Sequence, residues 1–352
     1  MATGDISLQT RKGKHPFENL KELLECKDIL FGNLETVLSN QGGKARKAVL
    51  LNSPPESVKY LKDAGFDILN IANNHISDMG IEGFNKTLDI LRENGLNFIG
   101  AGNNGKSISP PLILERNGLK LGFLGYTLKS IMTPECIPTN PLKERGIITD
   151  IESIKDKCDF IIVSLHWGTE NVFYPSPKQI DLAHKLVDNG ATLILGHHPH
   201  VVQGIEKYRR GLIAYSLGNF QFDPALSQSK TNRSMIICVT FNKDGIKDYS
   251  ILPVLINEDF LPSVIEGDEK DKFLRFLAEI SKPIKNGEIK NGWWFNKIAR
   301  EYLTSNMNSY KTRIKRYGIG HLLECILWLI SPFCLRCYLA IMTRWLRRAK
   351  RY

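Results

Sequence analysis

Short apolar runs that end in polar or glycine residues recur along the first 220 residues of the chain. Runs of this length, bounded by turn-forming residues, are typical of buried β-strands. The pattern predicts strands over residues 28–35, 67–74, 119–127, 158–168, 191–198 and 211–220. Helical patterns over residues 56–65, 80–95 and 176–190 fall between them, and each ends in a glycine that can stop a helix. Strands and helices in alternation predict an α/β fold.

The two ends of this region depart from the alternation. Residues 233–256 form two strand patterns joined by a turn at Asn242 to Gly245, so we expect a β-hairpin and sheets of mixed direction. The pair Gly4-Asp5 comes where a first strand should already have run its length. We therefore expect the first strand to be clipped, through a misplaced start or a fragmentary sequence, and a signal or anchor segment could be missing with it.

The chain changes character after about residue 258. Residues 268–284 have the pattern of an amphipathic helix, and residues 291–318 are aromatic and basic. We therefore divide the chain into a body, residues 1–257, and a helical, basic C-terminal region, residues 258–352.

The last segment of that region is apolar but interrupted. Its longest uncharged run, Cys325 to Leu335, is shorter than the roughly 20 apolar residues that a spanning helix needs. Trp328, Trp345 and the flanking arginines suit a helix that lies in a membrane interface. The alternative is a helical pair packed on the body with a solvated basic end. We expect membrane association, with the side of the membrane left open.

Charge separates the same two regions. The chain of 352 residues carries a net charge of +10, but residues 281–352 hold 15 Lys and Arg against 3 Asp and Glu. A mildly acidic body with a basic end predicts contact between that end and an anionic surface. No nucleic-acid recognition motif accompanies the charge, so we do not expect nucleic acid as a partner. Seven scattered cysteines do not form a disulfide framework, and the only C-x-x-C, at Cys334 and Cys337, has no second pair to complete a zinc site.

Polar side chains recur where the predicted strands end. They are Asp5, Asn33, Glu35, Asn73, Asn74, His75, Asp78, His166, His197, His198, His200 and Asn219. Strand ends are where α/β proteins place ligands, so we expect this set to converge on one rim of the sheets.

A single histidine would not predict a site, because most histidines are core or surface residues. We assign His15, His184 and His321 to that class. The remaining set combines imidazole, carboxylate and carboxamide groups, a mixture that binds divalent transition metals. Asp78 lies three residues after His75 and could hold its ring, while Pro199 lets His198 and His200 face one side. The sequence therefore predicts a metal or catalytic site.

The order of these blocks resembles one family. "GD", "NLE", "ANNHISDMG", "HWGTE", "GHHPHVVQ" and "YSLGNF" follow each other as in the CapA family, the poly-γ-glutamate capsule synthesis proteins. The resemblance covers about residues 1–255. It implies a metallophosphatase-like four-layer sandwich, two mixed β-sheets flanked by helices, here with a helical basic C-terminal extension.

The resemblance also implies roles for individual residues. The metal ligands would be Asp5, Asn33, Asn74, His166, His198 and His200. His75, oriented by Asp78, would protonate the leaving group or stabilise charge, and Glu35 would be a further ligand or a base. The substrate side would include Asn73, Glu170, Tyr215 and Asn219. The cofactor would be one or two divalent metal ions, Mn, Fe or Zn, that activate water for attack on phosphorus.

Four positions differ from the patterns of the superfamily and the family. Ser7 stands where the phosphoesterase pattern Asp-x-His has its histidine, and Asn33 and Glu35 stand in place of a bridging Asp. A single metal or a different ligand pair therefore stays open. Asn171 stands where the family often has an aromatic residue after "HWGTE". For an anionic substrate, Lys129, Arg145, Arg209 and Arg210 are candidate contacts, although each is more often a solvated charge.

Three functions remain. The first is a metal-dependent hydrolase of a phosphoester or related bond in capsule or envelope polymer synthesis, working with other synthesis proteins. The second is a non-catalytic, membrane-associated component that binds an anionic polymer during assembly or export. The third is a membrane-surface adaptor in which the basic end matters most.

Overall fold

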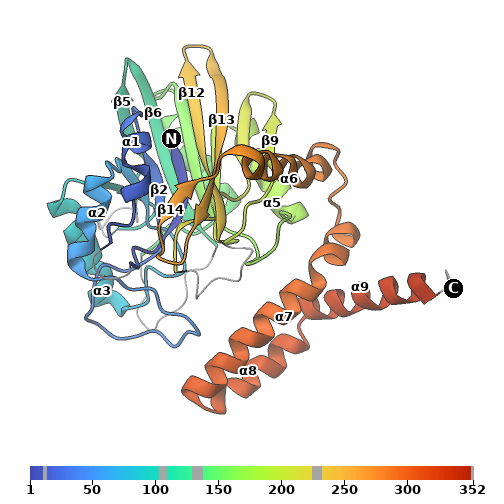
Figure 1. Ribbon diagram of the computed structural model, residues 1–352. Helices are drawn as coiled ribbons and strands as arrows, with labels where there is room; N and C mark the ends of the chain where they lie inside the picture. Colours follow the sequence, from blue (N-terminus) through green and yellow to red (C-terminus); the bar gives the residue numbers. More distant parts are fainter. Residues whose placement is uncertain (11–13, 103–108, 129–137, 224–231, 350–352) are drawn as a thin grey trace.

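The computed structural model describes residues 1–10, 14–102, 109–128, 138–223 and 232–349. Two β-sheets face each other, with helices on their outer faces and further helices extending from one side (Figure 1).

The first sheet is mixed, with eight strands among the described residues in the order β14-β13-β12-β1-β2-β3-β4 and with β11 also beside β1. Its strands are β1 (Ala2–Ile6), β2 (Phe31–Leu34), β3 (Ile68–Asn70), β4 (Asn97–Ile99), β11 (Asn219–Gln221), β12 (Arg233–Asn242), β13 (Gly245–Ile256) and β14 (Pro262–Val264). β1 pairs in parallel with β2 and β11 and antiparallel with β12. β12 and β13 form the hairpin that the sequence predicts. Whether β1 is clipped stays a prediction.

The second sheet is also mixed, with the strand order β5-β6-β7-β8-β10-β9. Its strands are β5 (Leu112–Arg116), β6 (Leu119–Thr127), β7 (Phe160–His166), β8 (Leu193–His197), β9 (Ile205–Tyr208) and β10 (Gly211–Ala214). The four central strands are parallel, and the edge strands β5 and β9 are antiparallel to their neighbours.

Three apolar cores separate four layers. One core joins the first sheet to α1 (Lys21–Glu25), α2 (Val58–Asp63) and α3 (Gly80–Glu93). A second lies between the sheets, where Phe31 stacks on Phe123. The third joins the second sheet to α4 (Glu144–Ile154) and α5 (Pro177–Asp188). The predicted fold, a four-layer α/β sandwich with two mixed sheets, is confirmed.

The predicted strand over residues 211–220 is two strands in different sheets. β10 ends at Ala214, and β11 begins at Asn219 in the first sheet. Gly218 between them has φ 76°, a left-handed conformation that glycine adopts without steric cost. Because both strands are buried, their apolar runs merge in the sequence and conceal the crossing.

The C-terminal region is mainly helical, as the sequence predicts, but its first residues include β14, which pairs with β13 in the first sheet. It contains α6 (Gly267–Lys285), α7 (Asn291–Tyr317), α8 (Gly320–Leu329) and α9 (Pro332–Ala349), and Figure 1 shows α7 to α9 extending from the body. α6 packs closely, since its Phe273 and Leu277 join the core between the sheets. The division at residue 257 stays a prediction.

Within the described part of the chain, none of the helices alone has the length and apolar character of a membrane span. α8 and α9 pass that test of length and composition only as a pair, bent by 54°. The six cysteines that the structure describes are free thiols, including Cys334 and Cys337 on α9.

Candidate metal centre

Strand register brings the predicted polar residues to one level. Asp5 on β1 lies beside Asn33 on β2 and Asn219 on β11. In the second sheet, His166 on β7 pairs with His197 on β8. Asp5, Asn33, His166 and His197 lie at or near the carboxyl ends of their strands, so the two sheets present polar ends to each other. Asn219 is predicted to end a strand, but it begins β11 and reaches the same level because β10 ends at Ala214.

A close backbone approach explains the glycine of the Gly4-Asp5 pair. A Cβ added at Gly4 would lie 1.9 Å from the carbonyl oxygen of Gly218. The backbone N–H of the next residue, Asp5, donates a hydrogen bond of 3.0 Å to that same oxygen. Only glycine lets β1 and β11 approach this closely, and the approach places Asp5 beside Asn219.

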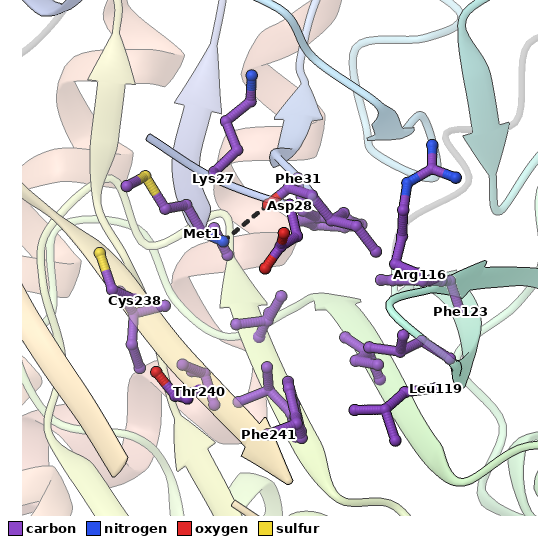
Figure 2. Close-up of a pocket in the computed structure, with 18 of the residues that line it drawn as sticks. Met1, Lys27, Asp28, Phe31, Arg116, Leu119, Phe123, Cys238, Thr240 and Phe241 are labelled. Carbon is purple, nitrogen blue, oxygen red and sulfur yellow. Dashed lines mark hydrogen bonds between the residues drawn. The ribbon is translucent and has the colours of Figure 1, made fainter. Parts of the chain in front are cut away.

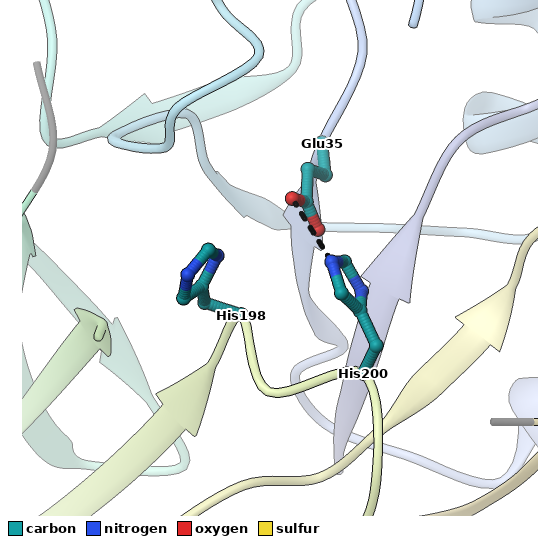
Figure 3. Close-up of side chains that lie close together, drawn as sticks. All are labelled: Glu35, His198 and His200. Carbon is teal, nitrogen blue, oxygen red and sulfur yellow. Dashed lines mark ion pairs between the residues drawn. The ribbon is translucent and has the colours of Figure 1, made fainter. Parts of the chain in front are cut away.

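Glu35 lies at the centre of the site. Its carboxylate belongs to two groups whose ligand atoms lie within 4.8 Å of one another: Glu35 with His198 and His200, and Glu35 with Asp5 and His166. Figure 3 shows Glu35 between the two imidazoles of the loop after β8. Glu35 Oε1 is 3.5 Å from His166 Nε2 and 3.9 Å from His200 Nε2.

The surroundings of Glu35 fit a cation. The side chain is fully buried, and neither carboxylate oxygen has a hydrogen-bond partner among the described residues. Burial, together with the charges of Asp5 and Glu170, raises the pKa of Glu35 well above its usual value. A buried carboxylate without donors is costly unless an ion balances it, and carboxylate with imidazole suits Mn, Fe or Zn.

His166 is tuned to the neutral form that metal ligation requires. Burial lowers its pKa well below the usual value, and the neighbouring histidines lower it further. Its Nε2 lies 2.6 Å from Asn74 Oδ1, and its Nδ1 lies 3.4 Å from Asn33 Nδ2. A neutral imidazole with fixed orientation is a competent ligand.

Asp5 is held as an anion by its neighbours. Asn33 Nδ2 donates a 2.8 Å hydrogen bond to Oδ1, and His197 Nδ1 lies 3.2 Å from the same oxygen. The backbone N–H of His198 donates to Oδ2 at 3.2 Å. Burial raises the pKa of Asp5, but the nearby His197 ring, together with His200 and Asn33, outweighs it and leaves that pKa below its usual value.

The loop after β8 holds its histidines in unusual backbone conformations. His198 has φ 92° and His200 has φ 58°, both in the region that favours glycine. Such conformations cost about 1–3 kcal/mol each and persist only where the surroundings enforce them. His200 Nδ1 lies 2.9 Å from Asn219 Oδ1, which fixes that ring from the first sheet.

His75 is oriented by a chain of polar contacts. Its Nδ1 lies 2.6 Å from Asp78 Oδ2, and Leu51 N donates to the same oxygen at 2.7 Å. Lys47 Nζ donates to the other oxygen of Asp78 and to the carbonyl of Asn74. Burial lowers the pKa of His75, and Asp78 offsets part of that effect. The remaining nitrogen, Nε2, lies 3.9 Å from Glu35 Oε1.

Some predicted ligands and substrate contacts have other partners here. Asn33 Oδ1 accepts a 2.9 Å hydrogen bond from Asn70, so Asn33 bridges Asp5 and Asn70 in this structure. Asn73 bonds Leu34 O and the N–H of His75, which shapes the turn.

Tyr215 is not brought to the site. Its ring stacks on Trp167 in the core, and its hydroxyl donates to Glu206 at 2.8 Å. The aromatic ring therefore belongs to the packing under the second sheet. Glu170 does reach the site, where its Oε1 lies 3.9 Å from His198 Nε2.

A pocket of about 550 Å³ opens over the cluster. Asn74, His75, His198, His200 and Asn219 line one side. The opposite side is a face of α7, with Tyr302, Ser305, Asn306, Ser309, Tyr310 and Arg313. The C-terminal region thus forms a wall of the site.

The cations at this pocket are not the ones that the sequence suggests. Arg145, Arg209 and Arg210 are exposed and do not line it, and Lys129 lies outside the described residues. The lining cations are Arg46, Lys47 and Arg313. The sequence does not identify these three cations as pocket residues. Each lies in a segment whose basic residues are expected to be solvated.

A second cavity, of about 290 Å³, lies at the opposite ends of the strands (Figure 2). The N-terminal amine of Met1 donates a 2.8 Å hydrogen bond to Ile29 O there. Its described lining is mainly apolar and includes no histidine. The candidate metal-binding side chains therefore lie at the other end of the sheets, in the pocket lined by His75, His198 and His200.

Comparison with known proteins extends the picture. A family model described as bacterial capsule synthesis protein PGA_cap matches residues 1–224. The capsule biosynthesis protein CapA of Bacillus anthracis is 33% identical over 275 residues, which cover 75% of this chain and 66% of that protein. The PGA biosynthesis protein CapA of Bacillus subtilis (strain 168) is 33% identical over 276 residues, 76% of this chain and 71% of that one. The chain thus spans about two thirds of the length of these relatives.

Solved structures resemble the chain more distantly. A hypothetical protein from Thermus thermophilus superposes with a TM-score of 0.48 at 17% identity, over 72% of this chain and 97% of that one. A phosphatase from Mycoplasma pneumoniae superposes with a TM-score of 0.46 at 14% identity, over 72% and 92%.

Proposed function

Because the chain belongs to the bacterial capsule synthesis protein PGA_cap family, we propose that it is a metal-dependent hydrolase of a phosphoester or related bond. It would act in the synthesis of poly-γ-glutamate capsule or another envelope polymer, together with other synthesis proteins. One observation carries the proposal. The buried Glu35 carboxylate belongs to two clusters of possible metal ligands, one with His198 and His200 and one with Asp5 and His166.

The chain offers ligands for one or two divalent ions. Glu35, His198 and His200 would hold one, and Asp5, Glu35 and His166 a second, with Glu35 common to both. Glu35 would then contribute to both ion sites, in the sequence block where the superfamily pattern has an Asp. A divalent metal bound there supplies Lewis-acid activation of water and of the reacting oxygen.

His75 is placed to move a proton. Asp78 fixes the Nδ1 side of the ring, so Nε2 faces Glu35 and the pocket. Nε2 can take a proton from the attacking water or return one to the leaving oxygen. Burial raises the pKa of Asp78, but His75 and then Lys47 lower it below the usual value, so Asp78 is held as an anion. The Leu51 amide also donates to this carboxylate and fixes its position beside the ring.

Hydrolysis of bis(p-nitrophenyl) phosphate in the presence of Mn²⁺ tests the proposal. We expect metal-dependent turnover, and Asp78→Asn to lower kcat by about 10²-fold because His75 loses its orientation. Asp63→Asn is the matched control. Asp63 also lies close to a histidine, with 3.6 Å between its Oδ2 and His15 Nε2, but this pair is at the surface. A chain that binds metal and hydrolyses no phosphoester would favour the second function, a non-catalytic binder of an anionic polymer.

We also propose that α8 and α9 rest on an anionic membrane surface. Leu323, Ile330 and Trp345 are 64%, 62% and 67% exposed, although large apolar side chains normally pack inside. Arg336 and Arg344 lie among them on α9. Apolar side chains flanked by arginines suit a helix pair in the headgroup region.

A further inference from the structure

We propose that the α7 face opposite the histidines is a second subsite, which binds carboxylates of an acidic polymer beside the metal centre. This inference deepens the proposed function and rests on it. The face consists of Tyr302, Ser305, Asn306, Ser309, Tyr310 and Arg313. Their spacing of three or four residues places them in one row along the helix. The row and the histidines His75, His198 and His200 line the same pocket.

α7 is fixed to the body at both ends. At its start, Trp294 is buried and its Nε1 donates a 2.9 Å hydrogen bond to Tyr174 O. At its end, Tyr317 Oη donates to Lys47 O at 2.9 Å. Between them, Asn171 Nδ2 donates to Ser305 Oγ at 3.2 Å. The row therefore has a defined position relative to the cluster.

The chemistry of the row favours an anion. Its hydroxyl, carboxamide and guanidinium groups are hydrogen-bond donors, and a guanidinium can bind two carboxylates at once. In this structure Arg313 Nη2 pairs with Glu324 Oε2 at 2.5 Å, so a polymer carboxylate would share Arg313 with Glu324. Asn306 Nδ2 donates to Tyr302 O at 2.9 Å.

α7 holds six Lys and Arg against one Glu, and Arg46 and Lys47 line the same pocket, with the Lys47 ammonium donating to Asp78. The acidic residue on the described pocket lining is Glu170. The metal ligands would bind the reacting group of the substrate. The row on α7 would then contact the charged polymer chain to which that reacting group is attached.

The row lies outside the part of the chain that the family model matches, residues 1–224. The body therefore carries the ligands that the family motifs supply, and α7 adds a wall from outside the matched residues. Asn171, where the family resemblance is imperfect, donates a hydrogen bond to Ser305 in this wall.

Adjacent residues on α7 provide a matched test. Ser309 and Asn308 are both exposed, but Ser309 lines the pocket and Asn308 does not. We would measure binding of a γ-linked glutamate oligomer to the full-length chain by calorimetry. Ser309→Asp should weaken binding by about tenfold through like-charge repulsion, and Asn308→Asp by less than about twofold because its charge points away and is screened. Asn306→Asp, a near-isosteric change within the row, should weaken binding as Ser309→Asp does.

Three results would overturn the subsite. They are equal loss in Ser309→Asp and Asn308→Asp, equal binding of a γ-linked glutamine oligomer by the wild type, and no binding of the glutamate oligomer. The proposed function is tested separately by metal-dependent turnover of the small diester. Turnover without oligomer binding would refute the subsite alone, and oligomer binding without turnover would refute the hydrolase alone.

Discussion

At the scale of single residues, Glu35 determines what the site can hold. It is fully buried and lacks hydrogen-bond donors among the described residues, so its ionised form is costly in the metal-free chain. The same carboxylate is shared by both candidate ligand groups. A side chain that destabilises the metal-free fold but is placed to bind a ligand is typical of a functional site.

This leads to a prediction for Glu35→Gln. In metal-free protein the variant should melt at a higher temperature than the wild type, because the buried charge is removed. The pKa of Glu35 is raised by burial, so its cost is absent below the unfolded pKa of about 4.3 and grows as pH rises toward the folded pKa. Thermal melts in a chelator from pH 4 to 8 should therefore show a gap that widens with pH. A gap that is constant or reversed would contradict the account.

The sequence identifies residues at this scale where a strand end and a side-chain type agree. Asp5, His166, His198 and His200 meet as expected because parallel strands share an edge. It could not separate Glu35 from Asn33, since both lie in one short block and only side-chain direction distinguishes them. It missed Lys47, because nothing local marks a basic loop residue that pairs with a distant Asp78. Tyr215 is predicted to lie on the substrate side, but its ring packs in the core, because a tyrosine in a motif can also have a packing role.

At the scale of elements, α7 makes two different contributions. Its first turns pack Trp294, Phe295 and Ile298 against the core under the second sheet, and its later turns line the pocket. The sequence predicts the helix and its basic character. It cannot predict the docking, because the apolar and polar rows of one helix do not reveal which surface they meet.

Trp294→Ala should therefore release α7 as well as destabilise the fold. Removing a buried aromatic side chain costs about 3–5 kcal/mol, and here the hydrogen bond to Tyr174 O is lost too. We expect a lower melting temperature and faster protease cleavage between α6 and α7. Trp345→Ala is the control, because its side chain is 67% exposed and should change stability by less than about 0.5 kcal/mol. Equal protease resistance in the two variants would show that α7 does not depend on this anchor.

At the scale of the whole molecule, the candidate metal site lies between a body of family type and a basic C-terminal region. The alternation of strands and helices in the sequence predicts the α/β class, and the family resemblance implies the four layers that the structure has. The pocket between the histidines and α7 cannot be predicted from the sequence. It depends on the contact of residues 291–317 with residues 46–51, which are distant in the chain.

The exposed apolar side chains of α8 and α9 predict binding to vesicles. The full-length chain should sediment with vesicles that contain phosphatidylglycerol, and less with neutral ones, because arginines flank the apolar side chains. Replacing Leu339 and Trp345 with Ser should reduce binding several-fold. Replacing the buried Ala340 with Ser changes the same helix without altering the exposed surface. Equal sedimentation of all three proteins would argue against a membrane role for α8 and α9.

The central claim is that strand ends from two sheets build a metal centre around Glu35. Its most direct test is the metal content of the purified protein, measured by elemental analysis beside a His198→Ala/His200→Ala double variant. The account predicts stoichiometric Mn, Fe or Zn in the wild type and loss of at least one equivalent in the variant. A wild type that holds no metal after reconstitution, while folded by circular dichroism, would contradict it.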